Sequence, residues 1–247
     1  MVSQFPQQLD TMRFQTPTGQ AALIRRLGLA MDPQRFPPEF FQREDDTNDA
    51  EFFTMPRLVV HIDDGAIVAV GRLFQQLIPE DAEVLDLMSS WRTHWPEEHP
   101  RRRIVGLGMN ATEMADNPQL NEYLLKDINA DPSLPFEDAS FDAVVITVSV
   151  QYLTQPVIVF SEVSRILRPG GVFIVTFSNR CFPTKAVRVW RSSNDEDHVE
   201  LVSSYMQHAG GFNGVRGGIA NPDMAPPGDP LFAVFAYKET DPEGRER

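Results

Sequence analysis

Residues 134–148 read LPFEDASFDAVVITV and contain the clearest strand of the chain. From Asp142 to Val148 most side chains are apolar on both faces of an extended segment, and several are β-branched. β-branched side chains favour strands, and a strand that is apolar on both faces is buried on both sides. Parallel sheets covered by helices contain such strands, so this segment predicts an α/β fold.

Similar short apolar segments lie on either side of this one. They predict strands over residues 83–87, 103–107, 122–126, 171–177 and 231–237. Apolar residues at helical spacing predict helices over residues 66–78, 157–167 and 195–208, and a short one over 19–29. Because strands alternate with helices, the chain predicts a doubly wound, mainly parallel sheet.

The chain divides into three parts by pattern. Residues 1–53 are irregular, rich in proline and acidic near their end, and predict an N-terminal extension that wraps the main domain, with a lid over a site as the alternative. Residues 54–238 carry the strand and helix pattern. Residues 239–247 are charged and predict a loose tail.

The composition excludes several classes of protein. Of the 247 residues, 22 are Lys or Arg and 35 are Asp or Glu, which gives a net charge of −13. Such an acidic chain disfavours nucleic acid and anionic membranes as partners. A single cysteine, Cys181, excludes an internal disulfide and a cysteine-rich zinc site. We therefore expect a cytoplasmic globular protein with no bound metal, and the oligomeric state stays open.

In doubly wound sheets, ligands bind beyond the carboxyl ends of the strands. That rule directs attention to the residues just after each predicted strand, which are 86–91, 108–110, 127–129, 149–152 and 178–185.

Two segments carry a family resemblance. Residues 134–144, LPFEDASFDAV, and residues 162–171, EVSRILRPGG, resemble class I, Rossmann-like methyltransferases that depend on S-adenosyl-L-methionine (SAM), in their type 11 subgroup. The resemblance extends over residues 57–237. It implies a Rossmann-like sheet with an antiparallel C-terminal strand, SAM as cofactor, and methyl transfer to a small molecule.

The first cofactor motif of this family, DxGxGxG, is altered here. Residues 86–92 read DLMSSWR, so the acid is present and the three glycines are not. The resemblance assigns Asp86 to the amino group of SAM, directly or through water, with capping of a following helix as the alternative. The hydroxyls of Ser89 and Ser90 could bond a ligand carboxylate or the amides of that helix. If Met88 or Trp91 filled the cavity, only the architecture would remain.

The next motifs differ in how well they match. Gly108 occupies the place of the acid that holds the ribose hydroxyls, and the amide oxygen of Asn110 could accept one of them. Asp127 and Ile128 match the acid and apolar residue that hold adenine. Ser149, after the fourth predicted strand, is expected beside the methyl group.

Three residues are candidates for catalysis. Tyr152 could orient a substrate, with packing in the core as the alternative. Arg180 suits an anionic group such as a carboxylate or phosphate, as does Lys185. His61 can titrate near neutral pH and could be a general base, with a surface or capping role as the more common alternative. Cys181, near two cations, could have thiolate character, although a lone cysteine is more often a small buried apolar residue.

These observations leave three hypotheses. The first is a SAM-dependent methyltransferase that acts on an unidentified small molecule, with an anionic substrate favoured by Arg180. The second is a non-catalytic protein of the same fold, a pseudo-enzyme or interaction module that has lost SAM binding, which the missing glycines favour. The third is chemistry other than methyl transfer with a SAM-like ligand.

Overall fold

The computed structural model describes residues 12–16, 36–223 and 228–240. The helix expected over residues 19–29 lies outside these ranges. The strands are β1 (Arg13–Gln15), β2 (Ala82–Ser89), β3 (Arg101–Gly108), β4 (Glu122–Leu125), β5 (Phe141–Thr147), β6 (Leu167–Phe177), β7 (Phe212–Ile219) and β8 (Phe232–Lys238). The helices are η1 (Pro38–Phe41), α2 (Asp49–Phe52), α3 (Asp64–Leu77), α4 (Ala111–Ala115), η2 (Val150–Tyr152), α5 (Pro156–Ile166), α6 (Arg188–Arg191) and α7 (Asp195–Ala209).

The strands form one sheet in the order β1-β7-β8-β6-β5-β2-β3-β4. Neighbours from β6 to β4 are all parallel, whereas β8 is antiparallel to both β6 and β7. The predicted α/β class, the mainly parallel sheet and the antiparallel C-terminal strand are therefore confirmed. All six predicted strands are present, and β6 begins at Leu167 rather than at residue 171.

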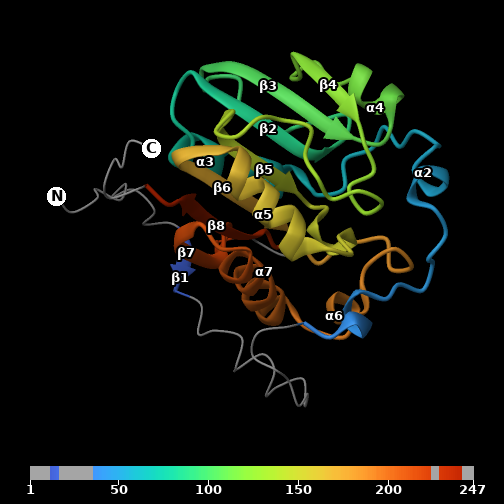
Figure 1. Ribbon diagram of the computed structural model, residues 1–247. Helices are drawn as coiled ribbons and strands as arrows, with labels where there is room; N and C mark the ends of the chain where they lie inside the picture. Colours follow the sequence, from blue (N-terminus) through green and yellow to red (C-terminus); the bar gives the residue numbers. More distant parts are fainter. Residues whose placement is uncertain (1–11, 17–35, 224–227, 241–247) are drawn as a thin grey trace.

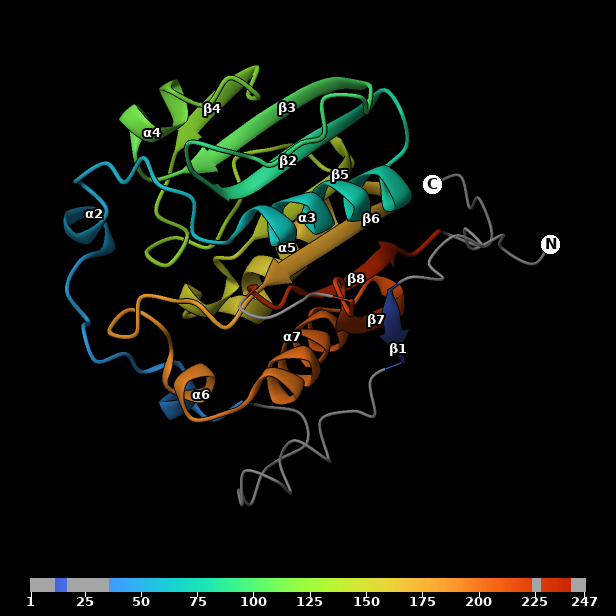
Figure 2. The same ribbon diagram turned by 180° about the vertical axis from the view of Figure 1, so that it is seen from behind.

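Helices cover the two faces of the sheet in separate layers. Figure 1 shows α5 and α7 in front of the sheet, and Figure 2 shows α3 on the opposite face. The first layer buries Phe160, Val163 and Val202 against the sheet, and the second buries Val70 and Phe74. Each helix presents its apolar stripe to strands that are apolar on both sides, as the sequence pattern predicts. None of the described helices is long and apolar enough to cross a membrane.

The two segments that carry the family resemblance are joined by Arg165 on α5. Its guanidinium donates to the backbone carbonyls of Leu134 and Phe136 and to the carboxylates of Asp138 and Glu162. One planar side chain with five N–H donors can satisfy all of these acceptors at once. Arg165 therefore holds the loop before β5 against the helix that follows it.

No helix connects β2 to β3: the described residues 90–100 form a loop. Trp95 in this loop is buried, with its ring stacked on His99 and tilted against Phe74 of α3. Its indole N–H donates to the carbonyl of His99. The capping role that the sequence allowed for Asp86 is therefore wrong, because no helix follows β2. The aromatic stack covers this part of the sheet instead.

The segment from residue 36 to residue 61, which we name the strap, runs along the carboxyl ends of the parallel strands (Figure 1). It is held by backbone hydrogen bonds from Asp45 to Thr184 and from Arg188 to Gln42. Further along, Asn110 donates to the carbonyl of Phe53 and Trp91 donates to that of Val59. The strap thereby links the loops that follow β2, β3 and β6.

We predict that Trp95→Ala lowers the free energy of unfolding by about 3–5 kcal/mol, because a large buried side chain would leave a cavity between the loop and α3. Trp91→Ala is the matched control. Trp91 belongs to the same loop but is only half-buried. Urea denaturation of both variants measures the difference, and similar losses in the two would contradict the role assigned to Trp95.

Candidate functional site

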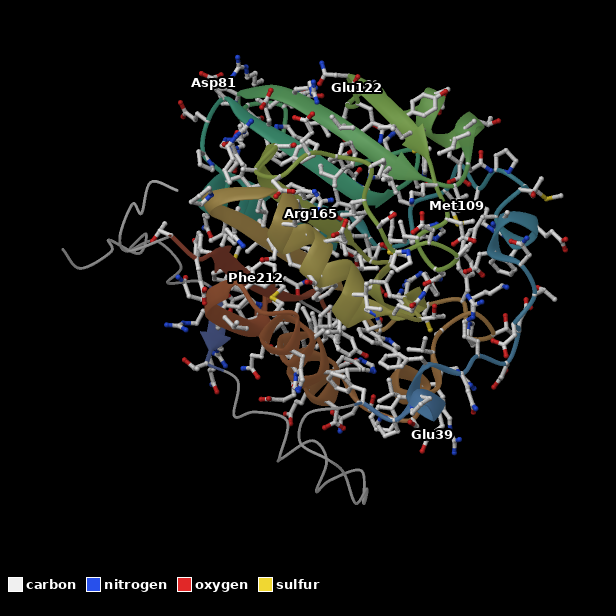
Figure 3. All side chains as sticks on the ribbon, viewed as in Figure 1. Glu39, Asp81, Met109, Glu122, Arg165 and Phe212 are labelled. Carbon is white, nitrogen blue, oxygen red and sulfur yellow. The ribbon has the colours of Figure 1, made fainter. Side chains whose placement is uncertain are left out.

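A cavity of about 540 Å³ opens at the carboxyl ends of the parallel strands. Figure 3 shows one lining residue, Met109, at the opposite end of the sheet from Asp81. The loops after β2, β3, β4, β5 and β6 all contribute to its wall, and the strap closes one side with Asp49, Phe53, Arg57 and His61. The volume is typical of cavities that hold small molecules and cofactors.

Nine of the ten residues singled out in the sequence line this cavity. They are His61, Ser89, Ser90, Asn110, Asp127, Ile128, Ser149, Tyr152 and Arg180. The tenth, Asp86, does not. The parallel arrangement of the strands brings these residues together, although they are up to 119 positions apart in the chain (180 − 61).

Asp86 is buried beneath the cavity wall. One of its carboxylate oxygens accepts hydrogen bonds from the hydroxyls of Ser89 and Thr93, at 2.8 Å and 2.7 Å. Burial raises the pKa of the Asp86 carboxyl to about 6, and the two hydrogen bonds oppose this shift. Asp86 therefore braces the loop after β2 and reaches the cavity only through Ser89.

Met88 takes the conformation that glycine adopts elsewhere. It stands at the position of the first glycine of the family motif, and its φ is 63°. This left-handed region is costly for a residue with a Cβ. The side chain of Met88 packs partly into the core and partly lines the cavity. Neither Met88 nor Trp91 closes the cavity, since Trp91 does not line it and stacks under Arg92 instead.

Gly108 is required by close packing at the end of β3. A Cβ on this residue would lie 2.3 Å from the carbonyl oxygen of Ser89, far inside van der Waals contact. An acidic residue cannot occupy this position while the loop after β2 follows its present path. The departure from the family pattern at residue 108 thus has a steric cause.

Asn110 uses its side-chain amide within the protein. Its oxygen accepts from the backbone N–H of Glu113, and its NH₂ group donates to the carbonyls of Phe53 and Thr54. It therefore caps α4 and anchors the strap, and the ribose contact predicted for its oxygen stays untested. Glu113 is another acceptor in the cavity lining. Its two carboxylate oxygens accept from the backbone N–H of Arg57 and the hydroxyl of Ser90, and they retain further lone pairs.

Asp127 and its neighbours present unused polar atoms to the cavity. One carboxylate oxygen of Asp127 accepts from the backbone N–H groups of Asn129 and Ala130, which fixes the turn after β4. Thr147 and Ser149, at the end of β5, also line the cavity, and their buried hydroxyls have no hydrogen-bond partner among the described residues. Buried polar atoms are nearly always paired, so these two hydroxyls fit a wall that receives a polar ligand.

The candidate catalytic residues differ in their surroundings. Burial lowers the pKa of His61, which therefore stays neutral at pH 7 and can accept a proton. Burial raises the pKa of the Tyr152 hydroxyl to about 12, and this oxygen accepts from the backbone N–H of Phe182. The side chain of Arg180 is 62% exposed, and its Nε donates to Asp229 at 2.8 Å.

Lys185 and Cys181 do not take the roles that the sequence suggested. Lys185 is fully buried, with its ammonium group bonded to the carbonyl of Thr47 and 3.2 Å from Asp49. It holds the strap and does not face the cavity, so its assignment to an anionic substrate was wrong. Cys181 lines the cavity, but burial raises the pKa of its thiol, which disfavours a thiolate.

Several lining residues lie outside the segments that the sequence singled out. Among them are Asp49, Phe53, Arg57 and Glu113. Three of them belong to the strap, whose sequence has no periodic pattern that would place it over the site. Glu113 could have been found, because Asn110 and Glu113 have the spacing of a helix cap and its third residue.

Comparisons with known proteins identify the fold. Residues 97–175 match the family model described as a methyltransferase domain. A possible histamine N-methyltransferase from Thermotoga maritima has a TM-score of 0.51 at 16% identity, over 70% of this chain and 90% of that one. The chain has the class I methyltransferase fold. The methyltransferase partner in a complex with the Trm112 activator of Haloferax volcanii gives a TM-score of 0.50 at 17% identity, over 72% and 92% of the two chains.

Two other matches indicate how far this likeness extends. A segment of 84 residues is 34% identical to the biotin biosynthesis bifunctional protein BioHC of Teredinibacter turnerae, and it spans 32% of this chain but only 15% of that protein. The [4+2]-cyclase SpnF has the same methyltransferase fold as this chain, with a TM-score of 0.50 at 13% identity over 78% and 91% of the chains. The fold alone therefore does not define the chemistry of its cavity.

We predict that Met88→Gly is more stable than Met88→Ala by about 1 kcal/mol. Both changes remove the same packing, but only glycine adopts a φ of 63° without a steric cost. At a position with an ordinary extended backbone, the alanine variant would be the more stable of the two. Thermal or urea denaturation of the two variants measures the difference, and a more stable alanine variant would contradict the strain assigned to Met88.

The raised pKa of Asp86 predicts a pH-dependent stability. Between its ordinary value of 3.8 and its folded value of about 6, the folded protein binds more protons than the unfolded chain. Rising pH therefore removes stability across this window, by roughly 3 kcal/mol for a shift of about two pKa units. The stability of wild type relative to Asp86→Asn should fall by this amount between pH 4 and pH 7. An unchanged difference, measured by urea denaturation, would contradict the shift.

Proposed function

We propose that this protein transfers a methyl group from SAM to a small molecule. The observation that carries the proposal is the set of residues at the ends of β4 and β5. Asp127, Ile128, Thr147 and Ser149 all line one cavity, and the hydroxyls of Thr147 and Ser149 are buried without a partner in the described part of the chain. This combination offers acceptors, an apolar surface and free hydroxyls, which suit a nucleoside.

The residues present fit the cofactor that the family uses. Asp127 would accept from the exocyclic amine of adenine, and Ile128 would cover the ring. Glu113 would accept from the ribose hydroxyls, because Gly108 cannot carry an acid and the amide of Asn110 is already bonded. Ser89 and Ser90 would face the methionine end. When bound, SAM supplies a methyl group on a positively charged sulfur that a nucleophile can displace.

His61 is the general base in this proposal. It lines the cavity, and its lowered pKa keeps the imidazole neutral and able to take a proton from a hydroxyl. Tyr152 stays protonated at neutral pH and is therefore not a base. Its ring positions the substrate, and its hydroxyl oxygen accepts from the backbone N–H of Phe182. Arg180 has two terminal nitrogens beyond its bond to Asp229 and can bind an anionic group.

The strap acts as a fixed cover in this proposal. Two of its tethers, the carbonyl of Phe53 and the N–H of Arg57, are bonded to Asn110 and Glu113 in the cofactor half of the cavity. A third anchor is the ionic cluster of Arg43, Asp49 and Lys185. Exclusion of water is the physical benefit, because alignment of donor and acceptor is most effective in a closed site.

Titration with S-adenosylhomocysteine tests the proposal. We expect binding at micromolar strength or tighter by calorimetry and a rise in Tm, because a ligand that binds only the folded state stabilises it. Asp127→Asn keeps the side-chain oxygen that accepts from the N–H groups of the turn, but it replaces the other carboxylate oxygen with an NH₂ donor. It should weaken binding by about 10–100-fold, the value of one charged hydrogen bond.

The matched control is Asp138→Asn, in the same loop, where the carboxylate accepts from Arg165 and neither residue lines the cavity. Its affinity should equal that of the wild type. Failure of wild type to bind either SAM or S-adenosylhomocysteine would overturn the proposal and leave a non-catalytic protein of this fold.

A further inference from the structure

Three aromatic side chains line one part of the cavity, which we name the aromatic wall. Phe53 comes from the strap, Tyr152 from η2 and Phe182 from the loop after β6. The rings of Tyr152 and Phe182 are stacked with centroids 5.9 Å apart, and the ring of Phe53 lies 6.4 Å from that of Tyr152. Phe53 and Phe182 are only partly buried, so part of their apolar surface is left for a ligand.

Arg57 places a cation against this wall. Its guanidinium lies 4.6 Å from the ring centroid of Phe52 and 5.3 Å from that of Phe182. Its side chain donates to the carbonyls of Phe52 and Met55, and within the described part of the chain no carboxylate forms an ion pair with it. A half-buried guanidinium is normally paired with an anion, so this one has capacity for an anionic group from a ligand.

The other charges around the wall do not cancel Arg57. Asp49 is neutralised by Arg43 and Lys185. Arg180 is paired with Asp229. Glu113 keeps its negative charge and accepts from the backbone N–H of Arg57 and the hydroxyl of Ser90, but it forms no ion pair with the Arg57 guanidinium in the described part of the chain. The imidazole of His61, whose ring meets that of Phe182 edge-on at 5.4 Å, is neutral at pH 7.

We propose that the methyl acceptor is an aromatic acid: a flat ring that carries a carboxylate, which Arg57 binds, and a hydroxyl, which faces His61. The inference rests on the proposed function and names its substrate class. An amine is disfavoured, because the guanidinium of Arg57 already lies beside the rings of Phe52, Phe53 and Phe182 and would repel a second cation there. A saturated acid would satisfy Arg57 but would lack the flat face that packs against the rings.

The chemical step balances with the groups named. The hydroxyl proton passes to the imidazole of His61, and the oxygen lone pair forms the new O–C bond. The electron pair of the broken S–C bond stays on the donor sulfur, which becomes a neutral thioether. The imidazolium then returns its proton to solvent.

Four ligands of matched size test the substrate class on protein saturated with S-adenosylhomocysteine. They are 4-hydroxybenzoate, 4-hydroxybenzyl alcohol, 4-hydroxybenzylamine and 4-hydroxycyclohexanecarboxylate, with affinities measured by calorimetry. We expect 4-hydroxybenzoate to bind at least about tenfold more tightly than each of the others, since each lacks either the negative charge or the flat ring. Equal or tighter binding of the amine, or of the saturated acid, would overturn the inference, as would binding of none of the four.

Two variants separate the contributions of charge and ring. Arg57→Gln should reduce the affinity for 4-hydroxybenzoate to that of the alcohol, and Arg188→Gln, an exposed arginine outside the cavity, is its charge-matched control. Phe182→Leu leaves the guanidinium in place and should remove the preference for the aromatic over the saturated acid. An unchanged preference in both variants would contradict the site.

Binding of S-adenosylhomocysteine distinguishes the two levels of failure. If wild type does not bind it, the proposed methyltransferase function itself fails. If wild type binds it and the four ligands show no preference for the aromatic acid, only the substrate class fails. Both site variants should retain this binding within about threefold, which also shows that they are folded.

Discussion

The backbones of the paired strands β2 and β3 approach each other closely at their carboxyl ends. This close approach constrains the part of the cavity where we propose that the cofactor binds. The carbonyl oxygen of Ser89 lies where a side chain on residue 108 would begin, so that residue must be glycine. Because no acid fits there, Glu113 on α4 is the ribose acceptor that we propose in its place. The loop after β2 can follow this path only because Met88 adopts a left-handed conformation. One backbone contact thus accounts for the two largest departures from the family motifs.

The strap is the second feature on which the site depends. Its ionic cluster is buried, and the ammonium group of Lys185 is satisfied by Thr47, Asp49 and the face of Phe52. Removing one partner of such a cluster would leave an uncompensated buried charge, so the cluster defines a single position for the strap. In that position Phe53, Arg57 and His61 face residues from the loops after β5 and β6. The part of the cavity that these residues line exists only because the strap lies there.

The sequence predicted the sheet and its loops better than it predicted the strap. Local patterns predict most strands, the principal helices of the described residues and the loops after the strands that line the cavity. Apolar periodicity and strand ends can be read along the chain, which is why these features were found. The strap could not be placed, because its residues have no repeating pattern and bond to loops that are 32 to 147 positions away. The glycine-rich strand β7 was missed for a related reason: Gly217 and Gly218 permit close contact with α7 and β1 but give no strand signal.

The sequence by itself determined the α/β class, the order of its elements and the edge of the sheet where a ligand would bind, because these depend on which residues are apolar and at what spacing. Only the tertiary structure decided which polar groups remain free. Internal hydrogen bonds and ion pairs engage the side chains of Asn110, Lys185 and Asp86. By contrast, hydrogen-bonding groups remain available for a ligand on Glu113, Thr147, Ser149 and Arg57. A side chain's availability depends on its neighbours in space, and distant segments of the chain supply those neighbours.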